Sequence, residues 1–197
     1  MAIRVEIEKL VGESVVLEPI RISHVDGLFD IGQVREDWAY LPISGFSCRA
    51  DTQKWVEQAL ALAESGSHYT FVLVQPSSGQ VMGSTRYLNI RERDHGLEIG
   101  YTWLGRSFQR TQVNTETKYL LLKHAFETIG AYRVELKTDL RNTRSQRAIE
   151  RLGAQREGVH RRHMIAQDGH IRDSVYYSIT DLDWPDIRKE LESRLKK

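Results

Sequence analysis

Two segments of the chain combine residue types and spacings that suit chemistry on an anionic substrate. In residues 97–116, an apolar strand pattern runs into a polar turn, which opens directly onto an amphipathic helix. N–H groups at a helix start lack intrahelical partners and lie at the positive end of the helix dipole, so such a junction can hold a phosphate or pyrophosphate. An ordinary strand–helix junction has the same pattern. The second segment, residues 139–153, shifts the balance towards the functional interpretation.

The elements that must position these segments indicate a mixed α/β domain. Alternating and apolar runs predict strands at 14–20, 69–74, 80–90, 97–104, 132–138, 160–166 and 171–180. Apolar residues at helical spacing predict helices at 23–32, 51–66, 114–130, 142–152 and 184–195, with Asp51 or Thr52 and Asn114 or Thr115 as the caps of the second and third. We expect a single domain with a mostly antiparallel central sheet and helices on both faces.

The composition is that of a globular protein without a strong overall charge. The 197 residues include 28 Lys and Arg against 27 Asp and Glu, a formal charge of +1, so no global field favours DNA or a membrane. The single cysteine, Cys48, fits a reducing compartment, and no stretch approaches the roughly 20 apolar residues of a membrane span. We expect a cytoplasmic protein with one domain over residues 1–183. A C-terminal helix over 184–197 is expected to pack on it or extend from it.

This order of elements, together with the two segments, resembles the GNAT superfamily of acyl-CoA-dependent N-acyltransferases over residues 12–180. The family's pyrophosphate loop reads Q/R-x-x-G-x-G/A and corresponds to residues 109–114, where Gln109 fits but Gln112 and Asn114 replace the glycines. The downstream pattern N-x-x-S-x-x-x-x-x-x-L-G is matched by Asn142, Ser145, Leu152 and Gly153. The chain resembles in particular the branch that acetylates N-terminal alanine or serine of ribosomal proteins.

The resemblance implies acetyl-CoA as the co-substrate and no metal. Main-chain N–H groups capture the pyrophosphate, and every residue except proline supplies one, so we expect the loop to bind without its glycines. The preceding strand would contact pantetheine through its backbone, and Asn142 would cap the next helix and touch the thiol end. Separately from the resemblance, residues 133–162 have a local excess of Lys and Arg that could meet the CoA phosphates, with Arg144 or Arg147 best placed, or contact ribosomal RNA. A solvated helix face is the commoner explanation. The expected binding residues are Ile99, Gly100, Tyr101, Gln109, Arg110, Thr111, Gln112, Val113, Asn114, Thr115, Asn142 and Arg147.

The reaction implied by the resemblance is attack of a neutral amine on the acetyl thioester, which needs a proton acceptor and a proton donor. Glu98 is the candidate base, directly or through water, although the polar side of an alternating strand explains it equally well. Many members have a tyrosine four residues before the closing glycine of the following helix, but Ile149 stands there. The ribosomal-protein branch has a serine in the first turn instead. Ser145 is therefore the candidate acid, with a bond to its own backbone as the alternative.

The acceptor site is the least determined part of the sequence. Trp38 and Tyr40 lie in the loop where GNAT proteins build that site, and core packing is an equal alternative. His160 and His163 are three residues apart on a predicted strand, so we expect them on opposite faces and not in a metal site.

Two other functions are compatible with the same sequence features. An acyl-CoA sensor without catalysis would explain the missing glycines and tyrosine, and an unrelated phosphate-binding α/β protein would explain the loop. If the chain is an acetyltransferase, its acceptor is a protein N-terminus, a small amine or an amino-acid analogue. A homodimer is a further open alternative, because dimers are common.

Overall fold

The computed structural model of the protein describes residues 2–43 and 45–196. The first residue of the expected domain 1–183 and the last residue of the expected helix 184–197 therefore lie outside the described residues. Its strands are β1 (Leu10–Val11), β2 (Val16–Pro19), β3 (Tyr69–Val74), β4 (Val81–Arg91), β5 (Gly96–Leu104), β6 (Arg133–Asp139), β7 (Gln155–Ile165) and β8 (Ile171–Thr180). Its α-helices are α1 (Val25–Gly32), α2 (Arg49–Glu64), α3 (Val113–Lys123), α4 (Thr143–Glu150) and α5 (Trp184–Leu195). A π-helical turn, His124–Ile129, extends α3.

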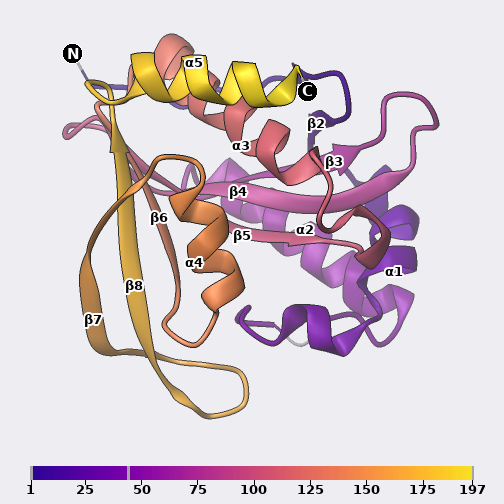
Figure 1. Cartoon of the computed structure of the whole chain (residues 1–197). Helices are drawn as coiled ribbons and strands as arrows, with labels where there is room; N and C mark the ends of the chain where they lie inside the picture. The colour runs from indigo at the N-terminus through magenta and orange to yellow at the C-terminus, as the bar shows by residue number, and fades with distance from the viewer. Residues whose placement is uncertain (1, 44, 197) are drawn as a thin grey trace.

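The strands form one eight-stranded sheet in the order β1-β2-β3-β4-β5-β6-β8-β7. Neighbouring strands are antiparallel except β5 and β6, which are parallel. Figure 1 shows α3 and α5 over one face of this sheet and α1 and α2 over the other. The expected fold class, a mixed α/β domain with helices on both faces of a mostly antiparallel sheet, is confirmed.

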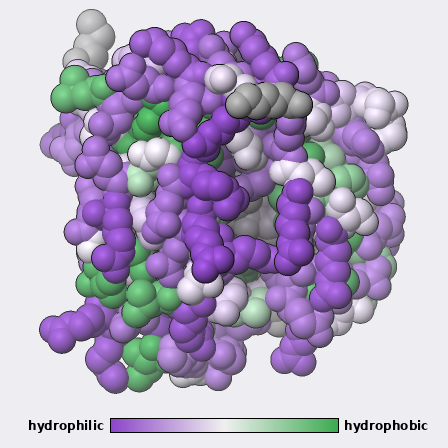
Figure 2. Space-filling view, viewed as in Figure 1, coloured by the Kyte–Doolittle hydropathy of each residue, from purple (hydrophilic) through white to green (hydrophobic). Residues whose placement is uncertain are grey.

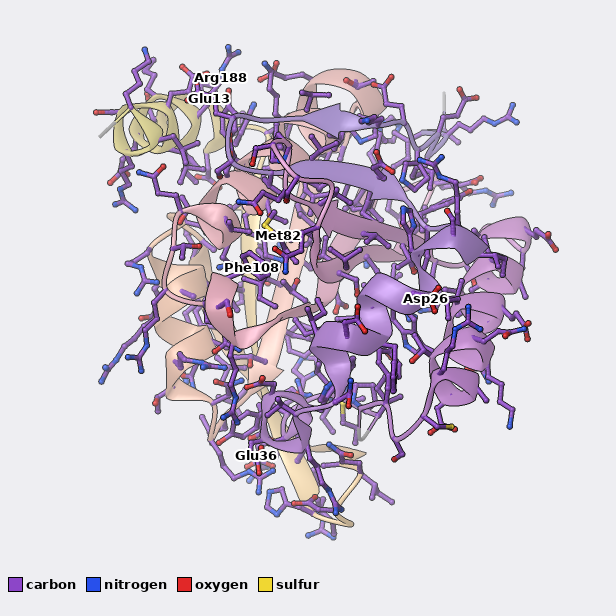
Figure 3. All side chains as sticks on the ribbon, turned by 90° about the vertical axis from the view of Figure 1, so that its right-hand side faces the viewer. Glu13, Asp26, Glu36, Met82, Phe108 and Arg188 are labelled. Atoms are coloured by element: carbon purple, nitrogen blue, oxygen red, sulfur yellow. The ribbon has the colours of Figure 1, made fainter. Side chains whose placement is uncertain are left out.

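Each face of the sheet has its own apolar core. The α3 face is packed by residues of α3, α4 and α5, including Leu121, Ile149 and Leu191. The α2 face is packed by residues of α1, α2 and the loop between them, including Val56 and Trp38. In Figure 3, Asp26 marks α1 and Glu36 marks the turn that follows it. Burial of each large apolar side chain stabilises the fold by about 1.5–3 kcal/mol.

Helix α5 is fastened to α3 by polar and aromatic contacts. The indole N–H of Trp184 donates to Glu127 at 2.9 Å, and its ring stacks on Phe126 with centroids 5.4 Å apart. The Tyr119 hydroxyl donates to Glu192 at 2.8 Å. The C-terminal segment therefore packs on the domain along its length.

Two of the expected helix starts are wrong by up to four residues. Helix α2 begins at Arg49 with Cys48 as its N-cap, because Asp51 occupies the third helical position and accepts the Cys48 N–H at 3.2 Å. Helix α3 begins at Val113 with Gln112 as its N-cap, so Asn114 is already helical. In both helices the polar residue chosen as a cap lies inside the first turn, where acidic and amide side chains also occur.

The face of the molecule seen in Figure 2 is mostly hydrophilic, with scattered apolar patches. Within residues 2–43 and 45–196, no helix has the length and apolar character that crossing a membrane requires.

Candidate active site

The pairing between β5 and β6 stops near the middle of the sheet. Three register pairs join them, and the last is Glu98 with Glu135. Beyond it, residues 99–104 pair only with β4 on the other edge, while β6 continues along β8. A row of backbone N–H and C=O groups on β5 is therefore free of ladder partners in the described structure, and this edge can bind an extended ligand by hydrogen bonds.

A bulge re-aims the side chains of β5 beside this free edge. The register with β4 shifts between Ser84 and Arg86, so Tyr101 and Thr102 together oppose Thr85. Tyr101 has a φ of 51°, a conformation that costs a residue other than glycine about 1–3 kcal/mol. The backbone irregularity of β5 therefore lies at Tyr101, one residue after Gly100. Bulges of this kind are frequent next to active sites.

Glu98 lies on the α2 face of β5 and is 2% exposed. Its Oε2 accepts hydrogen bonds from Asn89 Nδ2 at 2.6 Å and from Lys137 Nζ at 3.0 Å. Its Oε1 has no hydrogen-bond partner among the described residues. A Cβ at position 100 would lie 3.1 Å from Oε1, so Gly100 keeps that oxygen uncrowded. One oxygen of the carboxylate is held, and the other is available to accept a proton.

The loop before α3 is fixed by the side chain of Gln109. Its Nε2 donates to the Leu104 carbonyl at 2.9 Å, and its Oε1 accepts from Arg144 at 3.0 Å. Gln109 therefore ties the end of β5 to α4 across the loop. The sequence predicts that Gln109 contacts acetyl-CoA; it does not predict this link between β5 and α4.

The loop needs no glycine at the positions where the family has them. Gln112 has φ −68° and ψ −17°, a helical conformation open to any residue, and Asn114 is in the helix. The positive φ of the loop, 61°, falls on Arg110 instead. No left-handed conformation is therefore required of Asn114.

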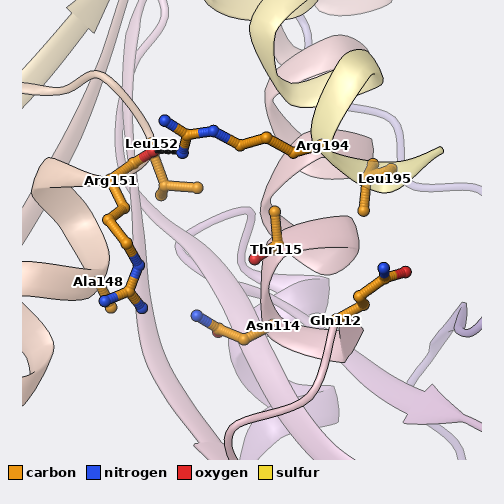
Figure 4. Close-up of a pocket in the computed structure, with 8 residues that line it drawn as sticks. All are labelled: Gln112, Asn114, Thr115, Ala148, Arg151, Leu152, Arg194 and Leu195. Carbon is orange, nitrogen blue, oxygen red and sulfur yellow. Dashed lines mark hydrogen bonds between the residues drawn. The ribbon is translucent and has the colours of Figure 1, made fainter. Parts of the chain in front are cut away.

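A cavity of about 240 Å³ lies at the N-terminus of α3 (Figure 4). It is lined by Gln112, Asn114, Thr115, Ala148, Arg151, Leu152, Arg194 and Leu195. The N–H groups of Gln112, Asn114 and Thr115 have no hydrogen-bond partner in the part of the chain described, whereas Val113 N–H donates to Thr111 Oγ1 at 3.3 Å. Free N–H groups, a helix start and two arginines fit the phosphates of an anionic ligand.

Arg194 was not predicted from the sequence, and Arg151 was only one member of the basic stretch over residues 133–162. Arg194 comes from α5 and donates to the Arg151 carbonyl, a contact that is drawn in Figure 4. Arg147, the residue expected at the phosphates, is exposed. The only sequence feature that marks Arg194 is the group of basic residues at the end of the predicted helix 184–195. No nearby sequence feature predicts that this helix end lies next to the loop 109–115.

Helix α4 begins as expected. The Asn142 side chain accepts the Ser145 N–H at 3.0 Å, which confirms Asn142 as the N-cap. Ser145 is half-buried in the first turn, and its hydroxyl makes no hydrogen bond within the described residues. Ile149 is 6% exposed and packs in the α3-face core. The Ser145 hydroxyl is thus not used to cap its own helix.

A buried lysine that sequence reasoning did not single out lies beneath the bulge. Lys118 of α3 is 6% exposed, and its Nζ donates to Thr102 Oγ1 at 2.6 Å. Thr102 Oγ1 in turn lies 2.8 Å from Thr85 Oγ1. Burial lowers the pKa of Lys118 to about 7. Its position on the stripe of Leu122 and Ala125 is the sequence signal that could have marked it as buried.

The two residues expected at the acceptor site lie in different environments. Trp38 is 1% exposed, donates to the Gly32 carbonyl at 2.9 Å and packs on Trp103 with centroids 4.4 Å apart. Tyr40 is 39% exposed and lies under the Arg141 guanidinium, 5.8 Å from its ring centroid. Trp38 is therefore a core residue, which was the alternative to a role in the acceptor site. Tyr40 is accessible to solvent.

His160 and His163 are on the same side of the sheet, which corrects the expectation of opposite faces. The five residues of β7 from His160 to Met164 oppose only three of β8, Arg172 to Ser174, so the alternation breaks there. The two rings lie 5.6 Å apart, and both contact Tyr176. Across residues 2–43 and 45–196, no group of three or more His, Cys, Asp or Glu side chains is arranged to hold a metal.

Comparisons with known proteins agree with this geometry. A family model described as an acetyltransferase (GNAT) domain matches residues 14–155. The chain is 24% identical to uncharacterized N-acetyltransferase p20 of Bacillus licheniformis over 172 aligned residues. The alignment covers 87% of this chain and 96% of that protein. It is 26% identical over 122 residues to the ribosomal protein uS5-alanine N-acetyltransferase of Escherichia coli (strain K12), covering 61% of this chain and 62% of that enzyme. The crystal structure of a GCN5-related N-acetyltransferase from Brucella melitensis matches with a TM-score of 0.91 and 28% identity, covering 98% of this chain and 88% of that one.

Proposed function

The chain belongs to the GNAT acetyltransferase family, and on that premise we propose that it transfers acetyl from acetyl-CoA to a primary amine by direct attack. The observation that carries the proposal is the free edge of β5 beyond Glu98. The Glu98 carboxylate lies at the start of this edge, and the cavity at the N-terminus of α3 lies beyond its end. The free edge would bind the pantetheine arm by backbone hydrogen bonds. The N–H groups at the start of α3, with Arg151 and Arg194, would hold the phosphates.

The reaction needs two proton transfers, for which the site offers one residue each. The amine lone pair forms a bond to the acetyl carbon while Glu98 Oε1 takes the amine proton, and collapse of the adduct breaks the carbon–sulfur bond. The Ser145 hydroxyl gives its proton to the departing thiolate and is restored by solvent. The products are the N-acetylated amine and CoA. Lys137 and Asn89 hold Glu98 Oε2 and so orient the carboxylate.

Asn114→Asp is expected to weaken CoA binding at least about tenfold without destabilising the protein. A negative charge at the first turn of α3 stabilises that helix by about 0.3–1 kcal/mol, yet it repels phosphates in the cavity that Asn114 lines. Calorimetric titration with CoA and a thermal melt of the free protein measure the two effects. Gln80→Glu, in the exposed turn between β3 and β4, is the control and should leave CoA affinity unchanged. Equal CoA affinity in Asn114→Asp would remove the phosphates from this cavity.

Ser145→Ala is expected to lower kcat about ten- to a hundredfold with the KM for acetyl-CoA unchanged, because it removes a proton donor and no binding contact. Thr143→Ala, at the first position of the same helix, serves as the control and should keep the wild-type kcat. The comparison is made by thiol release under conditions where chemistry is rate-limiting. A wild-type kcat in Ser145→Ala would leave this serine with a structural role.

The acceptor we propose is an α-amine. The Escherichia coli relative is named for acetylation of a ribosomal protein alanine, and an α-amine with a pKa of about 7.7–8.0 keeps a useful neutral fraction that a lysine amine near 10.4 lacks. Peptides beginning with Ala or Ser should therefore outcompete the same peptides with a blocked N-terminus and a free lysine. Equal use of both would overturn the acceptor assignment and leave acetyl transfer intact.

Acetyl-CoA turnover against a panel of N-terminal peptides and small amines, followed by thiol release, tests the function as a whole. Release that depends on an amine supports the proposal. Binding of acetyl-CoA without release by any amine would instead indicate an acyl-CoA sensor.

A further inference from the structure

An arginine with no counter-ion lies on the α2 face of the sheet, next to Glu98. Arg86 of β4 is 5% exposed, and no carboxylate of the described residues forms an ion pair with it. Its Nε is buried without a hydrogen-bond partner. A buried charge without a partner is strongly unfavourable, and proteins almost always pair it.

Two aromatic rings hold the guanidinium in place. Arg86 Cζ lies 5.0 Å from the ring centroid of Trp55 on α2 and 4.8 Å from that of Tyr101 at the bulge. Cation–π contacts of this kind compensate part of the lost hydration, but they leave the buried Nε–H without a hydrogen-bond acceptor. The neighbouring His68 is no counter-ion, because an imidazole is either neutral or positively charged. Burial and the nearby charge of Arg86 lower the pKa of His68.

The strand register places Arg86 beside the candidate base. Arg86 is opposite Gly100 and Leu88 is opposite Glu98, so Arg86 and Glu98 are diagonal neighbours on one face of the sheet. Such diagonal neighbours lie about 7–8 Å apart. Gly100 carries no side chain between them. An amine at Glu98 Oε1 would therefore lie on the same face of the sheet as Arg86, one register pair away along the strands.

We propose that Arg86 recognises a carboxylate carried by the acceptor close to its reacting amine. The inference rests on the proposed acetyl transfer and names the class of acceptor: an α-amine with a carboxylate a few bonds away, from a free amino acid or from an acidic residue near a peptide N-terminus. A planar carboxylate matches the fork of a guanidinium and neutralises the buried charge. A doubly charged phosphate would meet stronger repulsion from Glu98 on the same face.

The test compares the peptides Ala-Asp-Gly and Ala-Asn-Gly, both C-terminally amidated, in wild type and in Arg86→Met. Wild type should prefer the Asp peptide about 10- to 100-fold in kcat/KM, the value of a hydrogen bond to a charged group. Arg86→Met should bring that ratio to about one with the KM for acetyl-CoA unchanged. Arg91→Gln, in the same strand but paired with Glu135, should keep the wild-type ratio. A wild-type ratio near one, or a preference that survives in Arg86→Met, overturns the inference for the peptide source.

Free alanine and alaninamide form the second arm, with each rate corrected for the fraction of neutral amine. A preference for alanine that is lost in Arg86→Met identifies a free amino acid as the source. The inference falls if neither arm shows an Arg86-dependent preference.

Binding of the same compounds, measured by calorimetry without acetyl-CoA, separates this inference from the proposed function. Tighter binding of the Asp peptide or of alanine that is lost in Arg86→Met supports carboxylate recognition even if no amine releases thiol. Because the wild-type charge is unpaired, folding is checked by a thermal melt in which Arg86→Met should be at least as stable as wild type. A lower melting temperature would identify Arg86 as a structural residue held by the two rings.

Discussion

Glu98→Gln is expected to lower the acetylation rate about 10²- to 10³-fold near pH 6.5 and much less near pH 9. The wild-type enzyme can take the proton from a bound ammonium group, because Glu98 Oε1 has no other partner in the described structure. Without the carboxylate, only the neutral amine reacts. The neutral fraction of an α-amine falls tenfold per pH unit below its pKa of about 7.7–8.0. The measurement is kcat/KM for the amine against pH, by thiol release at saturating acetyl-CoA.

Glu135→Gln is the matched control for this experiment. Glu135 is the register partner of Glu98 on β6, but its carboxylate is occupied by Arg91 and Arg133. That variant should keep the shape of the wild-type pH profile. A Glu98→Gln profile parallel to that of wild type would show that this carboxylate takes no proton in the rate-limiting step.

Lys118→Met is expected to raise the free energy of unfolding by about 5 kcal/mol near pH 6. Burial lowers the pKa of Lys118 to about 7 from its ordinary 10.5, and each pKa unit corresponds to about 1.4 kcal/mol. Below pH 7 the native state must bury a charge, so the whole penalty is present. Between about pH 7 and 10.5 the unfolded state binds more protons than the native state, so wild-type stability rises with pH in that window.

Denaturant titrations between pH 6 and 10 measure both effects. The stability of Lys118→Met should change less with pH over that window than that of wild type. Lys123→Met, at the end of the same helix, should show neither the gain at pH 6 nor the flatter profile. A loss of stability in Lys118→Met at every pH would mean that the hydrogen bond to Thr102 outweighs the buried charge.

The sequence by itself determined the elements and the parts of the site that depend on near neighbours. The strand Tyr69–Val74 agrees at both ends with its prediction, because alternation and turn residues act over a few positions. The Asn142 cap is equally local, since its side chain bonds the N–H three residues later. Prolines are absent from the loop 109–115, so its supply of N–H groups could also be read directly from the chain.

Only the tertiary structure decided how Glu98 is held, which arginines face the loop and which side chains are buried. Asn89 and Lys137, the partners of Glu98, are 9 and 39 residues away in the sequence. Arg194 reaches the cavity from the last helix, and Arg86 lies unpaired between two rings. Hydrophobic periodicity and helix capping depend on residues a few positions apart in the sequence. Strand pairing and burial depend instead on contacts between segments that are far apart in the sequence. The charge balance around each group therefore exists only once the sheet has formed.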